Sequence, residues 1–135
     1  MKSVDWIWLY LKPRGRLTRL PYFLASMLVS ILSSFIVYRQ VLAYYPASAS
    51  DPWATPGLNE MLQAIYVVTL WPMIALSAKR VQDIGLTPFL GAAIAVPGIS
   101  MLAFFLLSLY PGTPGPNKYG AERNAPPAPA GDGQG

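Results

Sequence analysis

The 135-residue sequence contains no cysteine and no histidine. Without thiols or imidazoles, the chain can form no disulfide framework, no Cys/His metal site, no thiol nucleophile and no histidine base or pH switch. Charged residues are scarce as well, at 12% of the chain, where a soluble globular domain has about 25%. The chain therefore has too few polar groups to cover the surface of a soluble domain. We expect neither a metal nor an organic cofactor.

Long apolar runs occupy the regions that charged residues avoid. Hydrophobic residues make up 53% of the chain, and three uncharged runs lie at 20–38, 61–78 and 89–110. An α-helix rises about 1.5 Å per residue, so each run is long enough to cross most or all of a hydrocarbon layer of ~30 Å. None has the polar stripe of a soluble core helix. These runs predict an all-α membrane protein with three transmembrane helices, which form a three-span domain over residues 14–120.

The third run has a second interpretation, because Pro97 and Gly98 interrupt it. A bilayer tolerates a proline kink where neighbouring groups satisfy the freed carbonyl, and Pro72 raises the same question in the second run. Alternatively, the third run turns back as a re-entrant hairpin with arms at 89–96 and 99–110. As helices these arms would be only about 12 and 18 Å long. Because neither arm would cross the hydrocarbon, we favour a single kinked span.

The two ends of the chain differ from the apolar runs. Near the N-terminus, Ile7, Trp8 and Leu11 share one helix face. With further aromatic residues beside them, they predict an amphipathic helix over residues 1–13 that lies in the membrane interface. Residues 121–135 are rich in alanine, proline and glycine and have no apolar period, which predicts a disordered C-terminal tail.

Lysine and arginine are distributed unevenly between the segments that flank the runs. Most of them precede the first run or lie between the second and the third, and basic residues favour the cytoplasmic side of a membrane. With three spans, this predicts a cytoplasmic N-terminus and a C-terminus on the periplasmic side. A cleaved signal peptide is the rival interpretation, since Ala47, Ser48 and Ala49 resemble a cleavage site. However, the first apolar run is longer than that of an ordinary signal peptide.

Three short motifs flank the runs. A basic stretch, Pro-Arg-Gly-Arg-Leu-Thr-Arg at 13–19, precedes the first run, and Lys-Arg-Val-Gln-Asp-Ile-Gly at 79–85 follows the second. Pro-Gly-Thr-Pro-Gly-Pro-Asn-Lys-Tyr-Gly at 111–120, here called the exit motif, follows the third. In this order and spacing, over residues 10–120, the motifs resemble the bacterial membrane family known as domain of unknown function 805. The resemblance implies a location in the bacterial inner membrane and no assigned activity.

Two departures from the pattern of that family change the chemistry of the second motif. Its second motif resembles Arg-Arg-Leu-His-Asp, whereas this chain has Lys79 and Gln82 at the first and fourth positions. Gln82 removes any proton transfer that a histidine would support there. Lys79 keeps the charge of an arginine but lacks its planar, forked guanidinium group.

Basic residues in and beside the first two motifs are the candidate contact residues. Their plainest role is to fix the topology and to touch lipid phosphates, and a sharper hypothesis is a specific site for a phospholipid or a protein partner. The candidates are Lys12, Arg14, Arg16, Arg19, Lys79 and Arg80.

Asp83 is the acid that we expect to meet these cations. It follows Arg80 by three residues, the spacing of an ion pair on a helix. It could also bridge to Arg16 or Arg19 and so hold the first span against the second. We expect a structural bridge rather than catalysis. If Asp83 and Arg16 meet, the double variant Asp83→Arg with Arg16→Asp is expected to recover part of the stability that Asp83→Asn loses.

The exit motif has the residue types of tight turns and predicts a rigid cap at the membrane interface. It superficially resembles a phosphate-binding loop. That match is rejected, because the residue directly before its lysine is not glycine and the residue directly after it is neither serine nor threonine. Its candidate residues are Gly112, Thr113, Gly115, Asn117, Lys118, Tyr119 and Gly120.

Small residues within the runs are spaced for close helix packing. Ser26, Ser30 and Ser34 recur at four-residue intervals, and Gly91 and Ala95 form a second such pair. The runs contain no acidic or basic residue, which counts against a secondary transporter.

These observations favour a non-enzymatic membrane module. Its expected partners are the lipid bilayer with its anionic phospholipids, and either a second copy of the chain or another membrane protein; no nucleic acid is expected. The alternative is a component of a small oligomeric transporter or channel. An enzyme is disfavoured, because the sequence offers no nucleophile–base pair, no paired carboxylates and no metal cluster.

Overall fold

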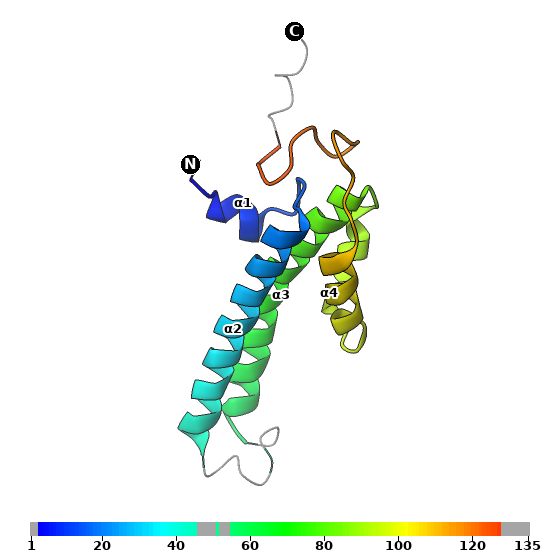
Figure 1. The fold of residues 1–135 in the computed structure, drawn as a ribbon. Helices are drawn as coiled ribbons and strands as arrows, with labels where there is room; N and C mark the ends of the chain where they lie inside the picture. Colours follow the sequence, from blue (N-terminus) through cyan, green and yellow to red (C-terminus); the bar gives the residue numbers. More distant parts are fainter. Residues whose placement is uncertain (1–2, 46–50, 52–54, 128–135) are drawn as a thin grey trace.

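The structure, a computed structural model, describes residues 3–45, 51 and 55–127. Over these residues the chain is helical and contains no strand (Figure 1). The elements in chain order are α1 (Trp6–Leu11), α2 (Arg19–Tyr44), α3 (Leu58–Ile84), the 3-10 helix η1 (Pro88–Ala95) and α4 (Ile99–Leu109).

The helix predicted at the N-terminus is present as α1, with narrower bounds. The Asp5 side chain begins it by accepting a hydrogen bond from the backbone N–H of Trp8 at 2.9 Å, as an N-cap does. The helix ends before Pro13, whose ring cannot continue it. Figure 1 shows α1 to one side of the α2–α3 pair, near its upper end.

The helices α2 and α3 form a long antiparallel pair (Figure 1). Hydroxyl groups join them: Ser33 and Thr69 lie 2.9 Å apart, and Tyr22 and Ser77 lie 3.3 Å apart. With 26 and 27 residues, the helices are about 39 and 40 Å long. Both extend beyond the apolar runs that predicted them, because the charged residues that bounded those runs are helical too.

The exposed surface of this pair is largely apolar, and four charged residues at one end of it are buried. Large hydrophobic side chains along both helices are exposed, and Val68 is 75% exposed, whereas Arg16, Lys79, Arg80 and Asp83 are fully buried. A soluble protein shows the opposite pattern. By length and composition, α2 and α3 could each span a membrane, and α4 is a shorter apolar helix.

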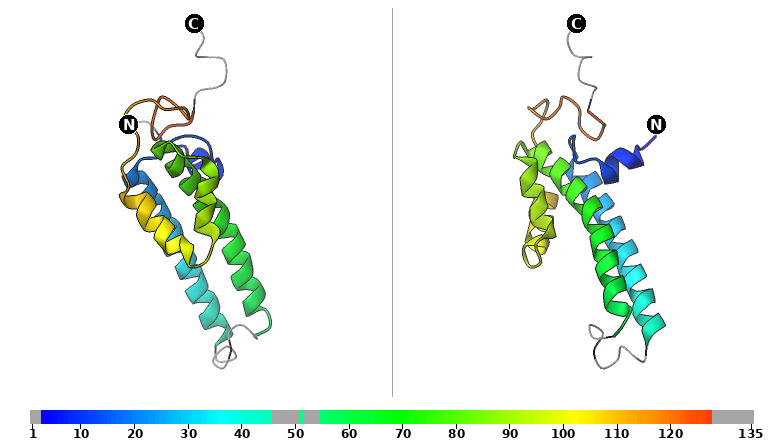
Figure 2. Two further views of the ribbon diagram at one scale, coloured as in Figure 1. Left: turned by 90° about the vertical axis from the view of Figure 1, so that its right-hand side faces the viewer. Right: turned by 180° about the vertical axis from the view of Figure 1, so that it is seen from behind.

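The third apolar run does not form one helix, so the prediction of a single kinked span is wrong. Instead, η1 runs along α3, the chain turns at Pro97 and Gly98, and α4 runs back (Figure 2). Gly98 has a φ of +87°, which glycine adopts without the strain of a side chain. The sequence argument assumed that each arm must cross the hydrocarbon. The arms do not need to, because both pack beside the longer helices.

This hairpin brings the exit motif to the same end of the fold as α1 (Figure 1, Figure 2). The expectation of chain ends on opposite sides of a membrane followed from three spans; in the described chain, which extends to Pro127, the N-terminal segment and the exit motif lie at the same end of the fold. Of the predicted disordered tail, residues 128–135 lie outside the described residues.

Candidate functional site

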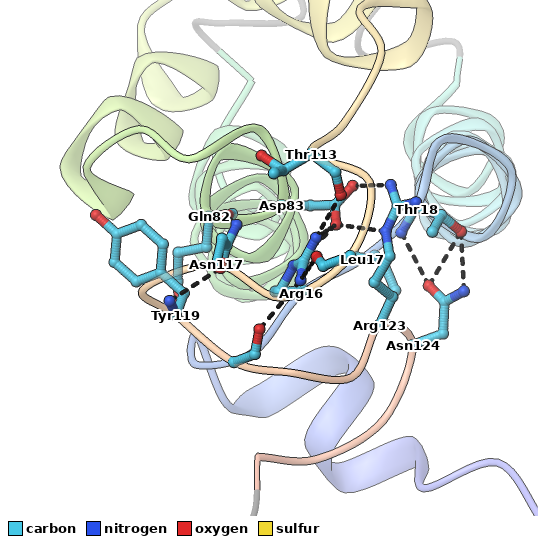
Figure 3. Close-up of polar contacts among 12 residues, drawn as sticks. Arg16, Leu17, Thr18, Gln82, Asp83, Thr113, Asn117, Tyr119, Arg123 and Asn124 are labelled. Atoms are coloured by element: carbon cyan, nitrogen blue, oxygen red, sulfur yellow. Dashed lines mark hydrogen bonds and ion pairs between the residues drawn. The ribbon is translucent and has the colours of Figure 1, made fainter.

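Three segments that are distant in sequence interlock at one end of the fold, here called the polar end (Figure 3). They are residues 12–19, before and at the start of α2; residues 79–83, in the last turns of α3; and residues 112–124, which include most of the exit motif. The structure brings all the sequence-predicted candidate residues together here. Four of them have fully buried charged side chains: Arg16, Lys79, Arg80 and Asp83.

Lys79 holds α1 in place. Its Nζ donates to the backbone carbonyls of Trp8 at 2.9 Å, Leu9 at 2.6 Å and Lys12 at 2.6 Å. The ammonium also lies 5.0 Å from the centroid of the Trp8 ring, within cation–π range. The last carbonyls of a helix lack internal partners and form its negative end. A compact ammonium with three donors therefore suits this position.

Replacing Lys79 by methionine should release α1 from α3, because the carbonyls at its end then lose their charged donor. We expect trypsin to cleave the bond after Arg14 at least tenfold faster, since cleavage follows the population of the open form and tenfold is about 1.4 kcal/mol. Lys118→Met, which removes an exposed lysine from the same end, is the control and should leave the rate unchanged. Equal rates in the two variants would show that Lys79 does not hold α1.

Asp83 is surrounded by three arginines, two of which, Arg16 and Arg123, are labelled in Figure 3. Its Oδ1 lies 3.1 Å from Arg16, its Oδ2 lies 2.8 Å from Arg80, and Arg123 bonds both oxygens through Nε and Nη2. The Arg16 and Arg80 contacts expected from the sequence are thus present. The hydrogen bond that Arg123 donates to Asp83 raises the pKa of Arg123 above its ordinary value. Both oxygens of the carboxylate are therefore engaged by arginines.

Arg16 fastens the exit motif to the rest of the polar end. Besides Asp83, it donates to the backbone carbonyls of Thr113 at 2.6 Å, Gly115 at 2.6 Å and Gly120 at 3.0 Å. The backbone N–H of Thr113 in turn donates to the Asp83 carbonyl at 2.7 Å. The exit motif thus presents its backbone carbonyl groups to a buried guanidinium group. Turn residues suit this role, because carbonyl groups in a turn are not all used by a helix or a sheet.

The other members of the exit motif shape the same turn. Asn117 donates its side-chain amide to the Gln82 carbonyl at 2.9 Å and accepts the Tyr119 backbone N–H at 2.9 Å. Lys118 lies over the Tyr119 ring, 5.1 Å from its centroid. At Gly112 an added Cβ would overlap the Asp83 carboxylate and Arg123. Small residues here therefore allow the motif to approach the buried ions closely.

Arg80 fastens the returning arm of the hairpin. Its Nε donates to the Leu107 carbonyl at 2.7 Å and its Nη2 to the Tyr110 carbonyl. Nη1 donates to Asp83 and, at 3.4 Å, to the Leu17 carbonyl. The end of α4, which lacks partners for its last carbonyls, is thus held by the same arginine that pairs with Asp83.

Gln82, which stands where the family pattern has histidine, makes structural contacts. Its side-chain amide donates to the Pro13 carbonyl at 2.6 Å, and its oxygen accepts the Gly15 backbone N–H at 3.4 Å. Residues 13–15 therefore contact the Gln82 side chain, and Asn117 bonds the Gln82 backbone carbonyl (Figure 3).

Sequence reasoning missed Arg123 and Asn124, which were placed in the disordered tail. Asn124 donates its backbone N–H to the Arg16 carbonyl at 2.8 Å and accepts the Thr18 N–H at 2.8 Å. Residues 121–124 are therefore anchored, which corrects the start of the predicted tail. The signal in the sequence was an arginine and an asparagine that interrupt an Ala/Pro-rich segment, next to a motif already assigned to the cap.

The structure divides the six predicted contact residues into two groups. Arg16, Lys79 and Arg80 are buried and donate to carbonyls of the protein, so in this conformation they are not free for a lipid headgroup. The exposed group, whose side chains remain available, consists of Lys12, Arg14 and Arg19.

A hydroxyl-lined cavity of about 570 Å³ lies away from the polar end, between α2, α3 and the hairpin. Ser33 and Thr69 bond each other, and Tyr66 donates to the Ala95 carbonyl at 3.0 Å. Within the described residues, no group of three His, Cys, Asp or Glu side chains could hold a metal ion. The hydroxyls lining the cavity belong to Ser30, Ser33, Ser34, Tyr66, Thr69 and Ser100.

A family model described as "Protein of unknown function (DUF805)" matches residues 10–121. The match includes the whole polar end up to Ala121, and Arg123 and Asn124 lie just beyond it. No curated protein and no solved structure matches the chain.

Proposed function

We propose that this chain, which belongs to the DUF805 family of proteins of unknown function, is an integral protein of the bacterial inner membrane. Its polar end contacts anionic phospholipids or a membrane partner, and it catalyses no reaction. The observation that carries this proposal is the inverted surface: the large apolar side chains of α2 and α3 face outward, while four charged side chains are buried. A bilayer covers such a surface at no cost to the apolar groups.

The position of α1 supports this placement. α3 is about 40 Å long and the hydrocarbon layer is ~30 Å thick, so one end of α3 projects beyond it. Trp71, at the middle of α3, donates its indole N–H to the Leu11 carbonyl at 3.0 Å, and Lys79 bonds carbonyls of α1 further along, so α1 lies beside the second half of α3. The outward side of α1 presents Trp6 and Ile7, which are 59% and 62% exposed. An aromatic, apolar face at this level suits the membrane interface.

The distribution of charge supports an orientation. Every basic residue of the described chain except Arg39 lies at the polar end or in the segments that lead into it. Because lysine and arginine favour the cytoplasmic side, the polar end faces the cytoplasm in this proposal. The N-terminal segment and the exit motif then share that side.

The chain has no cysteine, so single cysteines can test this topology with a membrane-impermeant maleimide in intact spheroplasts. We expect Tyr45→Cys to be labelled, and Ser3→Cys and Lys118→Cys to be labelled only after the membrane is opened. Labelling of the same single-cysteine variants in detergent is the control, which shows whether each cysteine can react at all. Labelling of Lys118→Cys together with Tyr45→Cys would restore the single kinked span, and labelling of all three would contradict membrane insertion.

A component of a small oligomeric transporter or channel is the second candidate function. The hydroxyl-lined cavity favours this candidate. Its hydroxyl groups lie along α2 and α3, where they could form hydrogen bonds with a polar solute that crosses the apolar layer. Flux of small solutes into liposomes that contain the purified protein tests this candidate. Flux that Ser30→Val abolishes would support a path along the cavity. If no flux is detected at any lipid composition, the transporter or channel candidate fails and the non-enzymatic interaction module is the function that remains.

A further inference from the structure

We infer that Arg19 and Arg123 form a binding site for the phosphate group of an anionic phospholipid. The inference rests on the proposed function, since it requires that the polar end faces a lipid surface. It goes further by assigning the contact to two residues, one of which lies outside the matched family region.

Hydrogen bonds place the two arginines at one edge of the polar end. The Thr18 backbone N–H donates to Asn124 Oδ1 at 2.8 Å, and Asn124 Nδ2 donates to the Thr18 hydroxyl at 2.9 Å. Arg19 follows Thr18 and Arg123 precedes Asn124, so the pairing of Thr18 with Asn124, which Figure 3 shows, joins segments more than a hundred residues apart and brings the backbone positions of the two arginines close together. Both arginines lie within electrostatic reach of buried Arg80.

Both arginines have donors that the protein does not use. Arg19 is exposed and makes no hydrogen bond or ion pair with the described residues. Arg123 uses Nε and Nη2 for Asp83, its Nη1 makes no hydrogen bond with the described residues, and its side chain is 31% exposed. Glu122, the neighbouring acid, pairs with neither of them among the described contacts.

Among the described residues, the positive charges at this edge outnumber the negative ones. Asp83 is the acid that Arg16, Arg80 and Arg123 share, and Arg19 adds a further positive charge nearby. The carbonyls that accept from Arg16 and Arg80 satisfy their N–H groups but leave the net charge in place. Buried charge without a counter-ion is unfavourable, so an anion from outside the chain stabilises this edge.

A phosphate fits this edge better than other anions available at a membrane. Guanidinium groups bind phosphate oxygens in bidentate fashion, and two of them at one edge could share a single phosphate. In the proposed membrane placement, the edge lies at the level of α1 and the start of α2, where phospholipid headgroups are found. The phosphate of phosphatidylglycerol is therefore the occupant to which the inference commits.

Native mass spectrometry of the whole chain tests this site. The protein is loaded in micelles of phosphatidylglycerol and phosphatidylcholine, then washed in about 1 M sodium chloride, where charge attraction extends only ~3 Å. We expect a single phosphatidylglycerol to remain per chain. Arg19→Gln, which removes no contact within the described protein, should lower the retained fraction about fivefold or more. Arg123→Lys keeps the charge for Asp83 but loses the fork, and should also lower it.

Arg14→Gln and Lys118→Gln remove exposed charges elsewhere at the polar end and should retain the lipid. If these variants lose as much phosphatidylglycerol as Arg19→Gln, the lipid is held by the general positive charge of the polar end. The inference of a specific site then fails, while the proposed contact with anionic lipid stands. If the unmodified chain shows no preference for phosphatidylglycerol even at low salt, the proposed contact with anionic lipid fails as well. Displacement of the lipid by millimolar inorganic phosphate would overturn the lipid assignment, since the edge would then bind free phosphate.

Discussion

Replacing Asp83 by asparagine is expected to lower the stability of the protein in detergent by about 3–5 kcal/mol, the range for breaking a buried ion pair on one side. Asparagine keeps the shape but removes the negative charge that Arg16, Arg80 and Arg123 share. Three guanidinium groups then lie together without a counter-ion. Thermal unfolding in micelles should show a midpoint about 10 °C or more lower.

Glu122→Gln is the matched control, because it removes one negative charge from an exposed position at the same end. Its effect should stay within about 0.5 kcal/mol. An unchanged midpoint for Asp83→Asn would show that the carboxylate does not hold these segments together, and would make a direct functional role for it more credible.

The geometry reverses one expectation from the sequence. Exchanging Asp83→Arg with Arg16→Asp was expected to recover stability, on the assumption that the two residues form an isolated pair. Asp83 also contacts Arg80 and Arg123, so the exchange would place a new arginine between two existing ones. We now expect the double variant to be less stable than Asp83→Asn, because it adds like charges at a buried position.

The two long helices could be predicted, because a long apolar run without charged residues is compatible with few structures other than a helix. Their ends could not, because charged residues were read as boundaries. Lys79, Arg80 and Asp83 continue α3, which ends only at Gly85, whose φ of +95° is that of a glycine cap. A glycine just past a helical pattern is the usual end signal. It outweighs the charges here, because those charges are neutralised or hydrogen-bonded by segments that only the fold brings together.

The Asp83–Arg16 contact could be predicted, because one acid among many cations leaves few pairings. The roles of Arg16 and Lys79 could not. Both were assigned to lipid contact, whereas the structure satisfies them with carbonyls of Gly115, Gly120 and the end of α1. Backbone carbonyls are acceptors at every position and leave no trace in a sequence. A buried cation held by carbonyls therefore cannot be told from an exposed one by its sequence alone.

The hairpin was disfavoured because each of its arms is too short to cross the hydrocarbon layer, but packing against α3 stabilises an arm that does not cross. Gly91 is buried, and an added Cβ there would lie 2.5 Å from the backbone nitrogen of Ala78 and 2.7 Å from its Cα. η1 thus rests directly on the α3 backbone, in the way that small residues allow in membranes. The spacing of Gly91 and Ala95 predicted close packing of this kind, although on a single span.

Gly91→Val is accordingly expected to push the hairpin away from α3. A backbone contact cannot yield as a side chain does, so the cost should lie at the upper end of the 1–3 kcal/mol range for overpacking. Because Arg80 holds α4 through the Leu107 and Tyr110 carbonyls, displacement of the hairpin should also loosen the polar end. The thermal midpoint in micelles should fall by about 5–10 °C.

A cysteine placed at Leu107 reports the displacement separately from stability. This residue is half-buried against the helices, and in the Gly91→Val background the cysteine should react several times faster with a membrane-permeant maleimide. Ala92→Val is the matched control, since it adds bulk to the next residue of η1 on the exposed side; it should change neither the midpoint nor the rate. If Gly91→Val behaves like Ala92→Val, η1 does not rest on α3, and the single kinked span becomes the better description of residues 89–110.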